Sequence, residues 1–216
     1  MIEVKNLTKD FKETKALDNV SLRFAAGKIH GLIGRNGSGK TVLLKILCGF
    51  MAPTSGEVLF DGKPALPGAL RESMGLIIES PGFIGSKSGF VNLWYLASLR
   101  KRITKEQVRQ AMETVGLDPA SKKAVRKYSM GMRQRLGIAQ AIMEDPAVIL
   151  LDEPMNGLDN QGVKDIRKVL MSLRDKGKTV LLASHSREDI AVLCDTVTEM
   201  EAGRAKQMNT KEMHNF

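Results

Sequence analysis

Residues 34–41 read GRNGSGKT and have the residue types and spacing that bind a chain of phosphates. The segment fits the P-loop pattern G-x-x-x-x-G-K-[ST]. Glycines let the backbone bend so that successive N–H groups converge on phosphate oxygens. Lys40 is then expected at the β- and γ-phosphates of a nucleoside triphosphate, and the Thr41 hydroxyl on Mg²⁺. The residues predicted to bind the nucleotide here are Gly34, Arg35, Asn36, Gly37, Ser38, Gly39, Lys40 and Thr41.

The segments on either side of the glycines fit the same interpretation. Ile29–Ile33 is a short, mostly apolar run typical of a strand, and residues 41–47 continue as a helix without Gly or Pro. A strand, a glycine loop and a helix are the context that the pattern requires. The positive N-terminus of such a helix points at the phosphates. The alternative, a flexible Gly/Ser turn without a ligand, is disfavoured by these flanks.

Two acidic residues and a histidine provide groups that could act on the bound phosphates. Asp152 and Glu153 follow residues 147–151, a run that predicts a buried parallel strand. The carboxyl ends of such strands are where α/β sheets bind ligands. Asp152 is expected to hold Mg²⁺ and Glu153 to polarise the attacking water. His185 follows the predicted strand at 179–184, so it should reach the same edge and orient that water. An ordinary acidic loop and a structural histidine are the alternatives.

The elements that must position these residues indicate an α/β fold with a parallel-sheet core. Strands alternate with helices from residue 147 onward, which implies crossover helices between parallel strands. We expect one domain over residues 1–216. Residues 1–85 and 146–216 should form a nucleotide-binding core with an antiparallel β subdomain, and residues 86–145 a helical subdomain. The strands are expected at 2–4, 20–24, 29–33, 57–60, 147–151, 179–184, 196–200 and near 205, and the helices of the insertion at 92–102, 105–115 and 131–143.

Composition excludes several classes of protein. The 216 residues are 43% hydrophobic and 26% charged, which is ordinary for a globular chain. No apolar run approaches the ~20 residues of a membrane span, and the N-terminus lacks a signal core. Cys48 and Cys194 are isolated, so we expect reduced thiols rather than a disulfide or a zinc site. The formal charge of +9 permits contact with an anionic membrane or nucleic acid, but the basic residues are spread out and a solvated surface is the favoured interpretation.

A further motif gives the chain a family resemblance. Residues 128–135 read YSMGMRQR and resemble the LSGGQ signature of ATP-binding cassette (ABC) transporters. In family order, Phe11 resembles the aromatic residue that stacks on adenine, Glu79 occupies the position of the Q-loop glutamine, residues 156–159 resemble the D-loop, and His185 the switch histidine. The resemblance covers essentially the whole chain. It implies the ABC-cassette form of the P-loop NTPase fold.

The signature implies a partner. Ser129 can cap a helix that opens near Gly131, and such a helix end favours an anion. In the family, that anion is the γ-phosphate held by the P-loop of a second subunit, so the resemblance implies a head-to-tail homodimer or heterodimer with ATP at its interface. Met130 and Met132 replace the third and fifth letters of the signature, from which we expect an altered dimer affinity. A helix start without a ligand is the alternative.

Glu79 is the other departure from the family pattern. An ionised glutamate only accepts hydrogen bonds and adds charge beside Mg²⁺, whereas a glutamine also donates. We expect Glu79 to bind the metal more directly or to pair with a basic group on a membrane partner. This glutamate together with the Y-S-x-G-M signature resembles the ATPases of bacitracin-resistance and lantibiotic-immunity exporters.

The resulting hypothesis is an ATP-hydrolysing subunit that powers a multi-component ABC exporter for antimicrobial peptide resistance or immunity, with ATP and Mg²⁺ as cofactors. Lys40, Glu153 and His185 are the expected catalytic residues, and Thr41, Asp152 and Glu79 the expected metal ligands. A separate transmembrane permease should dock near residues 79–90, which would hold the chain at the inner face of the cell membrane. No nucleic acid is expected. The alternatives are an ABC ATPase that acts on nucleic acid or ribosomes, and the ATPase of an importer. The transported substrate is not encoded in this chain.

Overall fold

The computed structural model describes residues 1–66, 74–79 and 82–208. In chain order the elements are β1 (Ile2–Phe11), β2 (Thr14–Phe24), β3 (Ile29–Ile33), α1 (Lys40–Cys48), β4 (Ser55–Phe60), β5 (Lys63–Pro64), β6 (Met74–Ile77), α2 (Gly89–Arg100), α3 (Lys105–Thr114), a 3₁₀ turn (Val125–Lys127), α4 (Met130–Ile142), β7 (Val148–Asp152), α5 (Asn160–Asp175), β8 (Thr179–Ala183), α6 (Arg187–Leu193), β9 (Thr196–Glu201) and β10 (Arg204–Gln207).

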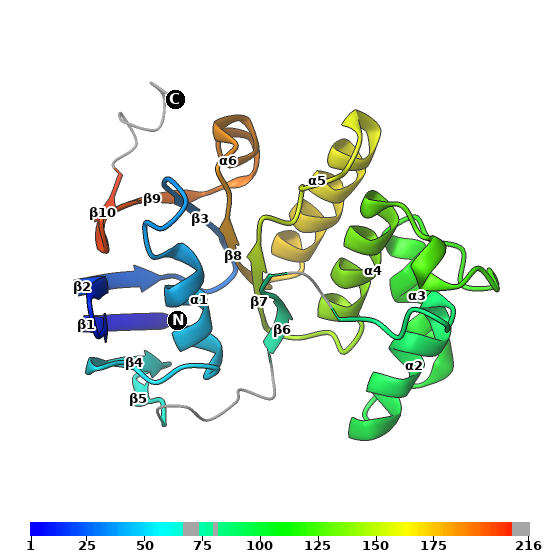
Figure 1. Ribbon diagram of the computed structural model, residues 1–216, viewed down its shortest axis with the longest axis horizontal. Helices are drawn as coiled ribbons and strands as arrows, with labels where there is room; N and C mark the ends of the chain where they lie inside the picture. The colour runs from blue at the N-terminus through cyan, green and yellow to red at the C-terminus, as the bar shows by residue number, and fades with distance from the viewer. Residues whose placement is uncertain (67–73, 80–81, 209–216) are drawn as a thin grey trace.

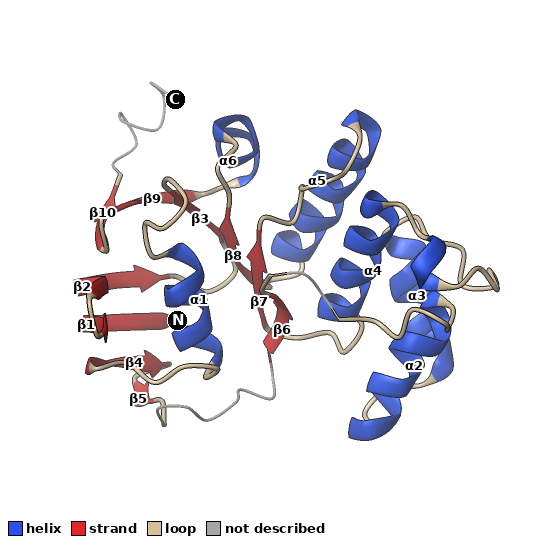
Figure 2. Ribbon diagram, in the orientation of Figure 1, coloured by secondary structure: helices blue, strands red, loops and turns tan. Residues whose placement is uncertain are grey.

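A six-stranded sheet in the order β10-β9-β3-β8-β7-β6 lies at the centre of the molecule (Figures 1 and 2). Strands β9, β3, β8, β7 and β6 pair in parallel, and β10 is an antiparallel edge. Every residue of β3 and β8 is buried, which is typical of parallel strands covered on both faces. The predicted α/β fold with a parallel core is confirmed.

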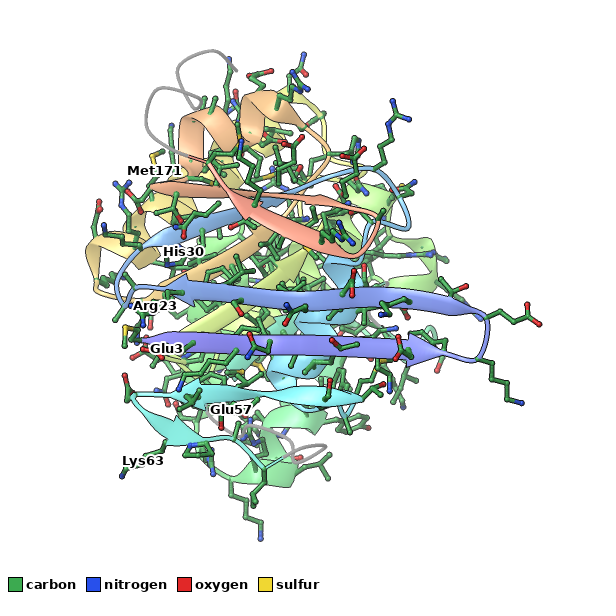
Figure 3. All side chains as sticks on the ribbon, turned by 90° about the vertical axis from the view of Figure 1, so that its left-hand side faces the viewer. Glu3, Arg23, His30, Glu57, Lys63 and Met171 are labelled. Atoms are coloured by element: carbon green, nitrogen blue, oxygen red, sulfur yellow. The ribbon has the colours of Figure 1, made fainter. Side chains whose placement is uncertain are left out.

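A second, four-stranded antiparallel sheet has the order β2-β1-β4-β5. Asp61 and Gly62 join β4 to β5 with φ angles of 49° and 77°, as both central residues of a type I′ turn need positive φ. Figure 3 shows Glu3, Arg23 and Glu57 on neighbouring strands of this sheet. The Arg23 and Glu3 side chains approach to 4.0 Å at the surface, where an ion pair contributes at most about 1 kcal/mol.

Helix α1 packs against both sheets, which fixes the direction of the glycine loop before it. Leu43, Leu44 and Leu47 of this helix are fully buried. They share one apolar cluster with Phe24 of the antiparallel sheet and Leu181 of the parallel sheet. Burying a leucine contributes about 1.5–3 kcal/mol, so this helix is anchored by far more than its own backbone hydrogen bonds.

Helices α2, α3 and α4 gather beyond β6 and β7, on the side away from the antiparallel sheet (Figure 1). Helix α3 begins at its predicted residue behind a capping box, in which the Thr104 hydroxyl accepts from the Gln107 N–H and the Gln107 side chain accepts from the Thr104 N–H. Helix α2 begins earlier than predicted because the Ser88 hydroxyl caps it. Apolar side chains of all three helices join one cluster with the strands β7 and β8.

Some elements were not predicted from the pattern. Strand β6 reads only MGLI and is defined by its parallel pairing with β7, in which Met74 lies opposite Val148. Helix α6 spans seven residues, too few to be stable alone. It is held by the Ser186 cap and by Asp189, which is buried and paired with Arg167 of α5.

Candidate functional site

The glycine loop connects β3 to α1 at the carboxyl edge of the parallel sheet. Gly34 and Gly39 have φ angles of 151° and 107°, a region that favours glycine. A β-carbon on Gly34 would lie 2.2 Å from the Met200 carbonyl oxygen, and one on Gly39 would lie 2.6 Å from the Ala16 carbonyl oxygen. The backbone at these positions therefore requires glycine.

Two features of the loop suit a phosphate chain. The Lys40 side chain is buried, and its Nζ donates to the carbonyl oxygens of Gly34 at 2.6 Å and Arg35 at 3.2 Å. The buried Ser38 hydroxyl finds no hydrogen-bond partner anywhere in residues 1–66, 74–79 and 82–208. Gly39 is the N-cap of α1 and offers no side-chain acceptor to the first amides of the helix. An anion with several oxygens would satisfy all of these groups.

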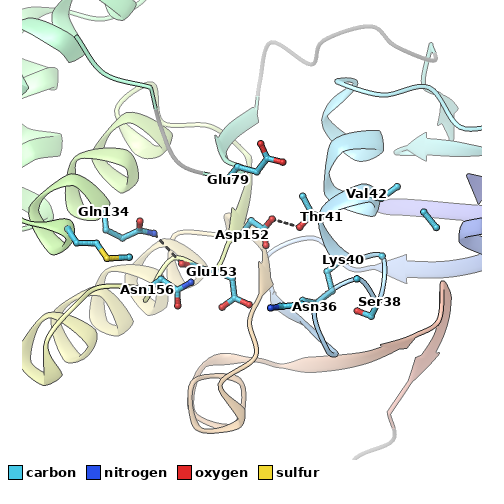
Figure 4. A pocket seen from close by; sticks show the side chains of 14 residues that line it. Asn36, Ser38, Lys40, Thr41, Val42, Glu79, Gln134, Asp152, Glu153 and Asn156 are labelled. Atoms are coloured by element: carbon cyan, nitrogen blue, oxygen red, sulfur yellow. Dashed lines mark hydrogen bonds between the residues drawn. The ribbon is translucent and has the colours of Figure 1, made fainter. Parts of the chain in front are cut away.

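Two of the three predicted metal ligands, Thr41 and Asp152, meet across the sheet edge. Thr41 Oγ1 donates to Asp152 Oδ2 at 2.6 Å, as the dashed line in Figure 4 shows. The described residues contain no group of three or more His, Cys, Asp or Glu side chains that could hold a metal. Mg²⁺ does not need one, because it keeps several waters and takes one or two protein oxygens plus phosphate oxygens. The hydroxyl and the carboxylate therefore fit Mg²⁺ bound together with a nucleotide.

Glu153 and His185 form a hydrogen-bonded pair, with 2.9 Å between Glu153 Oε2 and His185 Nδ1. Glu153 has a φ angle of 50°, and its N–H donates to the Ala183 carbonyl at the end of β8. Its own carbonyl accepts from Gln134 Nε2 at 3.3 Å (Figure 4). The backbone turn after β7 is thus held on both sides, which aims the carboxylate away from the strand and toward His185.

A cavity of about 620 Å³ lies beside the glycine loop and the two acidic residues after β7. Its walls include the glycine loop, Glu79, Asp152, Glu153 and the start of α4. His185 and Arg35 line a neighbouring cavity of about 680 Å³ on the other side of the loop. The loop therefore separates the two spaces, and the carboxylate of Glu153 and the ring of His185 meet at their boundary.

The start of α4 also faces the first cavity. Ser129 is its N-cap, as predicted, and the Ser129 hydroxyl accepts from the Met132 N–H at 3.1 Å. Met130 is 66% exposed and lines the cavity, whereas Met132 packs partly buried against the core. A β-carbon on Gly131 would lie 2.9 Å from the Gly157 carbonyl oxygen. The signature helix thus rests closely on the loop at 156–159 of the same chain.

The structure does not bring Phe11 to the wall of either cavity. Phe11 ends β1 beside the hairpin, is 43% exposed, and has the Lys9 ammonium 5.2 Å from its ring centre. Ala16, on the following strand, lines the first cavity instead. The adenine role of Phe11 therefore stays a prediction.

Glu79 lines the first cavity, but its carboxylate is engaged within its own chain. Lys45 Nζ lies 2.5 Å from Glu79 Oε1. The sequence predicted a metal contact or a basic group on a membrane partner and missed Lys45. The available signal was spacing: Lys45 lies four residues after Thr41, so both side chains project from one face of α1. Of the predicted docking segment 79–90, Ser80 and Pro81 lie outside the described residues; Phe83 and Phe90 pack partly buried on the core.

The two cysteines, Cys48 and Cys194, are both buried, and no disulfide joins them. Burial raises the pKa of the Cys194 thiol to about 12, which keeps it protonated and unreactive.

A strand, a glycine loop and a helix, with an Mg²⁺-type hydroxyl–carboxylate pair at the next strand but one in the sheet, define a P-loop nucleoside triphosphatase. Comparison with known proteins narrows this class. Residues 17–156 match the family model for ABC transporters. The chain is 42% identical over 205 residues to an uncharacterized ABC transporter ATP-binding protein, YybJ, of Bacillus subtilis (strain 168), covering 94% of each chain.

Two more similarities extend the match. The bacitracin transport ATP-binding protein BcrA of Enterococcus faecalis is 40% identical over 218 residues, covering 99% of this chain and 71% of that protein. The dimeric structure of the ABC transporter cassette MJ0796 superposes with a TM-score of 0.87 at 24% identity, covering 97% of this chain and 99% of that one, and shows the fold. The chain belongs to the ABC transporter family of ATP-binding proteins, and it is an ATPase of that class. No helix in the described part of the chain is long and apolar enough to cross a membrane.

Proposed function

We propose that the chain hydrolyses ATP with Glu153 and His185 acting on the attacking water. Glu153 accepts a proton from the water. His185 Nδ1 lies 2.9 Å from the Glu153 carboxylate and orients the same water beside the γ-phosphate. Lys40 leaves the carbonyls of Gly34 and Arg35 for the β- and γ-phosphate oxygens. Thr41 and Asp152 would hold Mg²⁺, which when bound would neutralise charge that develops on the phosphates. The observation that carries this assignment is that Lys40, Thr41, Asp152 and Glu153 line one cavity, while His185 reaches its boundary through the contact with Glu153.

The second part of the proposal is a head-to-tail dimer. The cavity is open, and its wall includes the outward-facing start of α4 with Ser129 as cap. In the dimer, the partner subunit's Ser129 and the amides after it would contact the γ-phosphate bound by this chain. The partner subunit's Met130 and the partner subunit's Met132 would flank that contact. The similarity to a cassette solved as a dimer supports this arrangement.

The third part concerns transport. The similarity to a bacitracin transport ATP-binding protein supports a role in exporting an antimicrobial peptide. The chain would act with a separate transmembrane permease and sit with it at the inner face of the cell membrane. ATP-driven dimer closure and release would move the permease, whose own residues would select the cargo.

Phosphate release from ATP tests the hydrolytic part. The purified chain should hydrolyse ATP with Mg²⁺, and Glu153→Gln should lower kcat by about 100-fold or more, the usual contribution of a general base. Retained binding of a fluorescent ATP analogue shows that the variant is folded. A full hydrolysis rate in Glu153→Gln would remove Glu153 from the mechanism.

Cell survival tests the transport part. The chain should be expressed with its native permease in cells sensitive to bacitracin, beside a Lys40→Met version as control. Protection by the unmodified pair alone supports export. Equal survival of both strains over a panel of antimicrobial peptides would reject this class of cargo while leaving the ATPase assignment intact.

A further inference from the structure

The Lys45–Glu79 ion pair joins the helix that follows the glycine loop to the segment that follows β6. Lys45 Nζ lies 2.5 Å from Glu79 Oε1, and the Lys45 side chain is 26% exposed. In Figure 4 the Glu79 side chain points toward α1. Glu79 also has a φ angle of 62°, an uncommon conformation for a residue with a β-carbon. The Glu79 side chain is 65% exposed, so the contact with Lys45 is what directs its carboxylate toward α1.

Helix geometry places this pair directly behind the metal ligands. Thr41 and Lys45 are four residues apart on α1, so they lie one above the other on the same face. Thr41 contacts Asp152 at the end of β7, and Lys45 contacts Glu79 beyond β6, the parallel neighbour of β7. One helix face thus makes two adjacent polar contacts with two adjacent strand ends.

The charges around the cavity explain why the second contact matters. The cavity wall carries three carboxylates, Glu79, Asp152 and Glu153, against the single ammonium of Lys40. A triphosphate brings further negative charge into this space. Asp152 accepts a hydrogen bond from Thr41, and Glu153 is hydrogen-bonded to His185. The partner of Glu79, in contrast, is Lys45, which does not line the cavity. Lys45 is not part of the wall and supplies its positive charge from behind.

We propose that Lys45 is a positioning residue that holds Glu79 away from Mg²⁺ and cancels its charge, so that this third carboxylate does not oppose the triphosphate. The inference rests on the proposed ATP site. It replaces the expectation that Glu79 ligates the metal. Without Lys45, the Glu79 carboxylate would weaken nucleotide binding.

A double-mutant cycle tests this coupling. The variants are Lys45→Met, Glu79→Gln and both together, with Lys164→Met as a matched control that removes an exposed lysine from α5. The readout is the equilibrium Kd of a fluorescent ATP analogue at fixed Mg²⁺ and low salt, with thermal unfolding of each ligand-free variant measured beside it. Lys45→Met should weaken binding by roughly threefold to tenfold, because the Glu79 carboxylate would then repel the triphosphate without a neighbouring positive charge, in a site that is partly exposed.

The same substitution should change the Kd by less than about twofold when Glu79 is already Gln, because no charge is then left to cancel. The control Lys164→Met should leave the Kd unchanged. An equal loss of affinity from Lys45→Met in both backgrounds would mean that Lys45 only supports the helix, and would overturn the proposal.

A titration with Mg²⁺ separates the proposal from metal ligation by Glu79. The Mg²⁺ concentration for half-maximal nucleotide binding should be unchanged in Glu79→Gln within about twofold, because a ligand that never reaches the metal contributes nothing to it. A severalfold rise in that concentration would make Glu79 a metal ligand and reject the inference. Absence of any nucleotide binding by the unmodified chain would instead reject the proposed function itself.

Discussion

Two helices, α1 and α4, begin at the same cavity, and the N–H groups of their first turns are capped in different ways. Helix α1 has Gly39 as its N-cap, which supplies no side-chain acceptor. Helix α4 has Ser129 as its N-cap, and the Ser129 hydroxyl already accepts from the Met132 N–H. The start of α1 therefore still needs an anion, whereas the start of α4 is partly satisfied without one.

This difference indicates which of the two helix starts can bind nucleotide without a second subunit. At α1, Lys40 is buried and the Ser38 hydroxyl has no hydrogen-bond partner within the described part of the chain, so we expect a single chain to bind the triphosphate. At α4, the exposed Met130 lies over Gly157, and Lys123 contacts Met132 with 3.8 Å between Nζ and Sδ but does not line the cavity. We therefore infer that the α1 end binds nucleotide first, and that the α4 end contributes only when a second subunit presents its own bound phosphate.

The largest expected effect comes from removing the charge at the α1 end. Lys40→Met should weaken ATP binding by about 100-fold, because charge-assisted hydrogen bonds to phosphate contribute about 1.5–3 kcal/mol each. Titration with a fluorescent ATP analogue measures the change. Lys164→Met serves as the control for a lost lysine elsewhere, and an unchanged Kd in Lys40→Met would contradict the unconditional role of this end.

The next largest effect concerns dimerisation of a variant that cannot hydrolyse ATP, so that the bound nucleotide remains a triphosphate. Glu153→Gln with ATP and Mg²⁺ should shift from one subunit to two in light scattering coupled to size exclusion. The same variant with Lys40→Met added should remain a monomer, because the α1 end must bind before the α4 end of a partner can close on it. A strictly monomeric Glu153→Gln in saturating ATP would count against the dimer.

Ser129→Ala should separate the two helix ends. It removes the α4 cap, so the free energy of unfolding should fall by about 1 kcal/mol. Affinity of the single chain for ATP should change by less than about twofold, since the α1 end is untouched. In the Glu153→Gln background the dimer should weaken by about tenfold, the value of one hydrogen bond to a charged group. If Ser129→Ala lost affinity for ATP but still dimerised, this would contradict the assignment of nucleotide binding to α1 and of the dimer contact to α4.

The smallest effect concerns the thioether that covers the α4 end. Met130→Gly, made in the Glu153→Gln background, should tighten the ATP-dependent dimer by about threefold, because the amides become more open to a partner's phosphate. Met130→Leu keeps the bulk and should leave the dimer affinity unchanged. Concentration-dependent light scattering gives both dissociation constants. A weaker dimer in Met130→Gly would mean that the methionine contacts the partner favourably.

Much of the fold could be predicted because its signals are local. The strand–loop–helix unit around the glycines, the apolar run before Asp152 and the Thr104 cap each depend on a few neighbouring residues. Strand β6 could not be predicted in this way, since four residues carry little periodicity and their strand conformation comes from pairing with β7. The short helix α6 likewise depends on the buried Arg167–Asp189 pair.

The amino-acid sequence was sufficient to select Lys40, Thr41, Asp152, Glu153 and His185 as candidate site residues, because each stands at a fixed offset from a strand end or a glycine. Which side chains pair was decided only by the tertiary structure. The Glu153–His185 contact joins residues 32 positions apart, and the Lys45–Glu79 contact joins residues 34 positions apart. Such pairings depend on the order of strands in the sheet and on the rotation of α1 against it, which are set by the packing of the whole core rather than by any one segment.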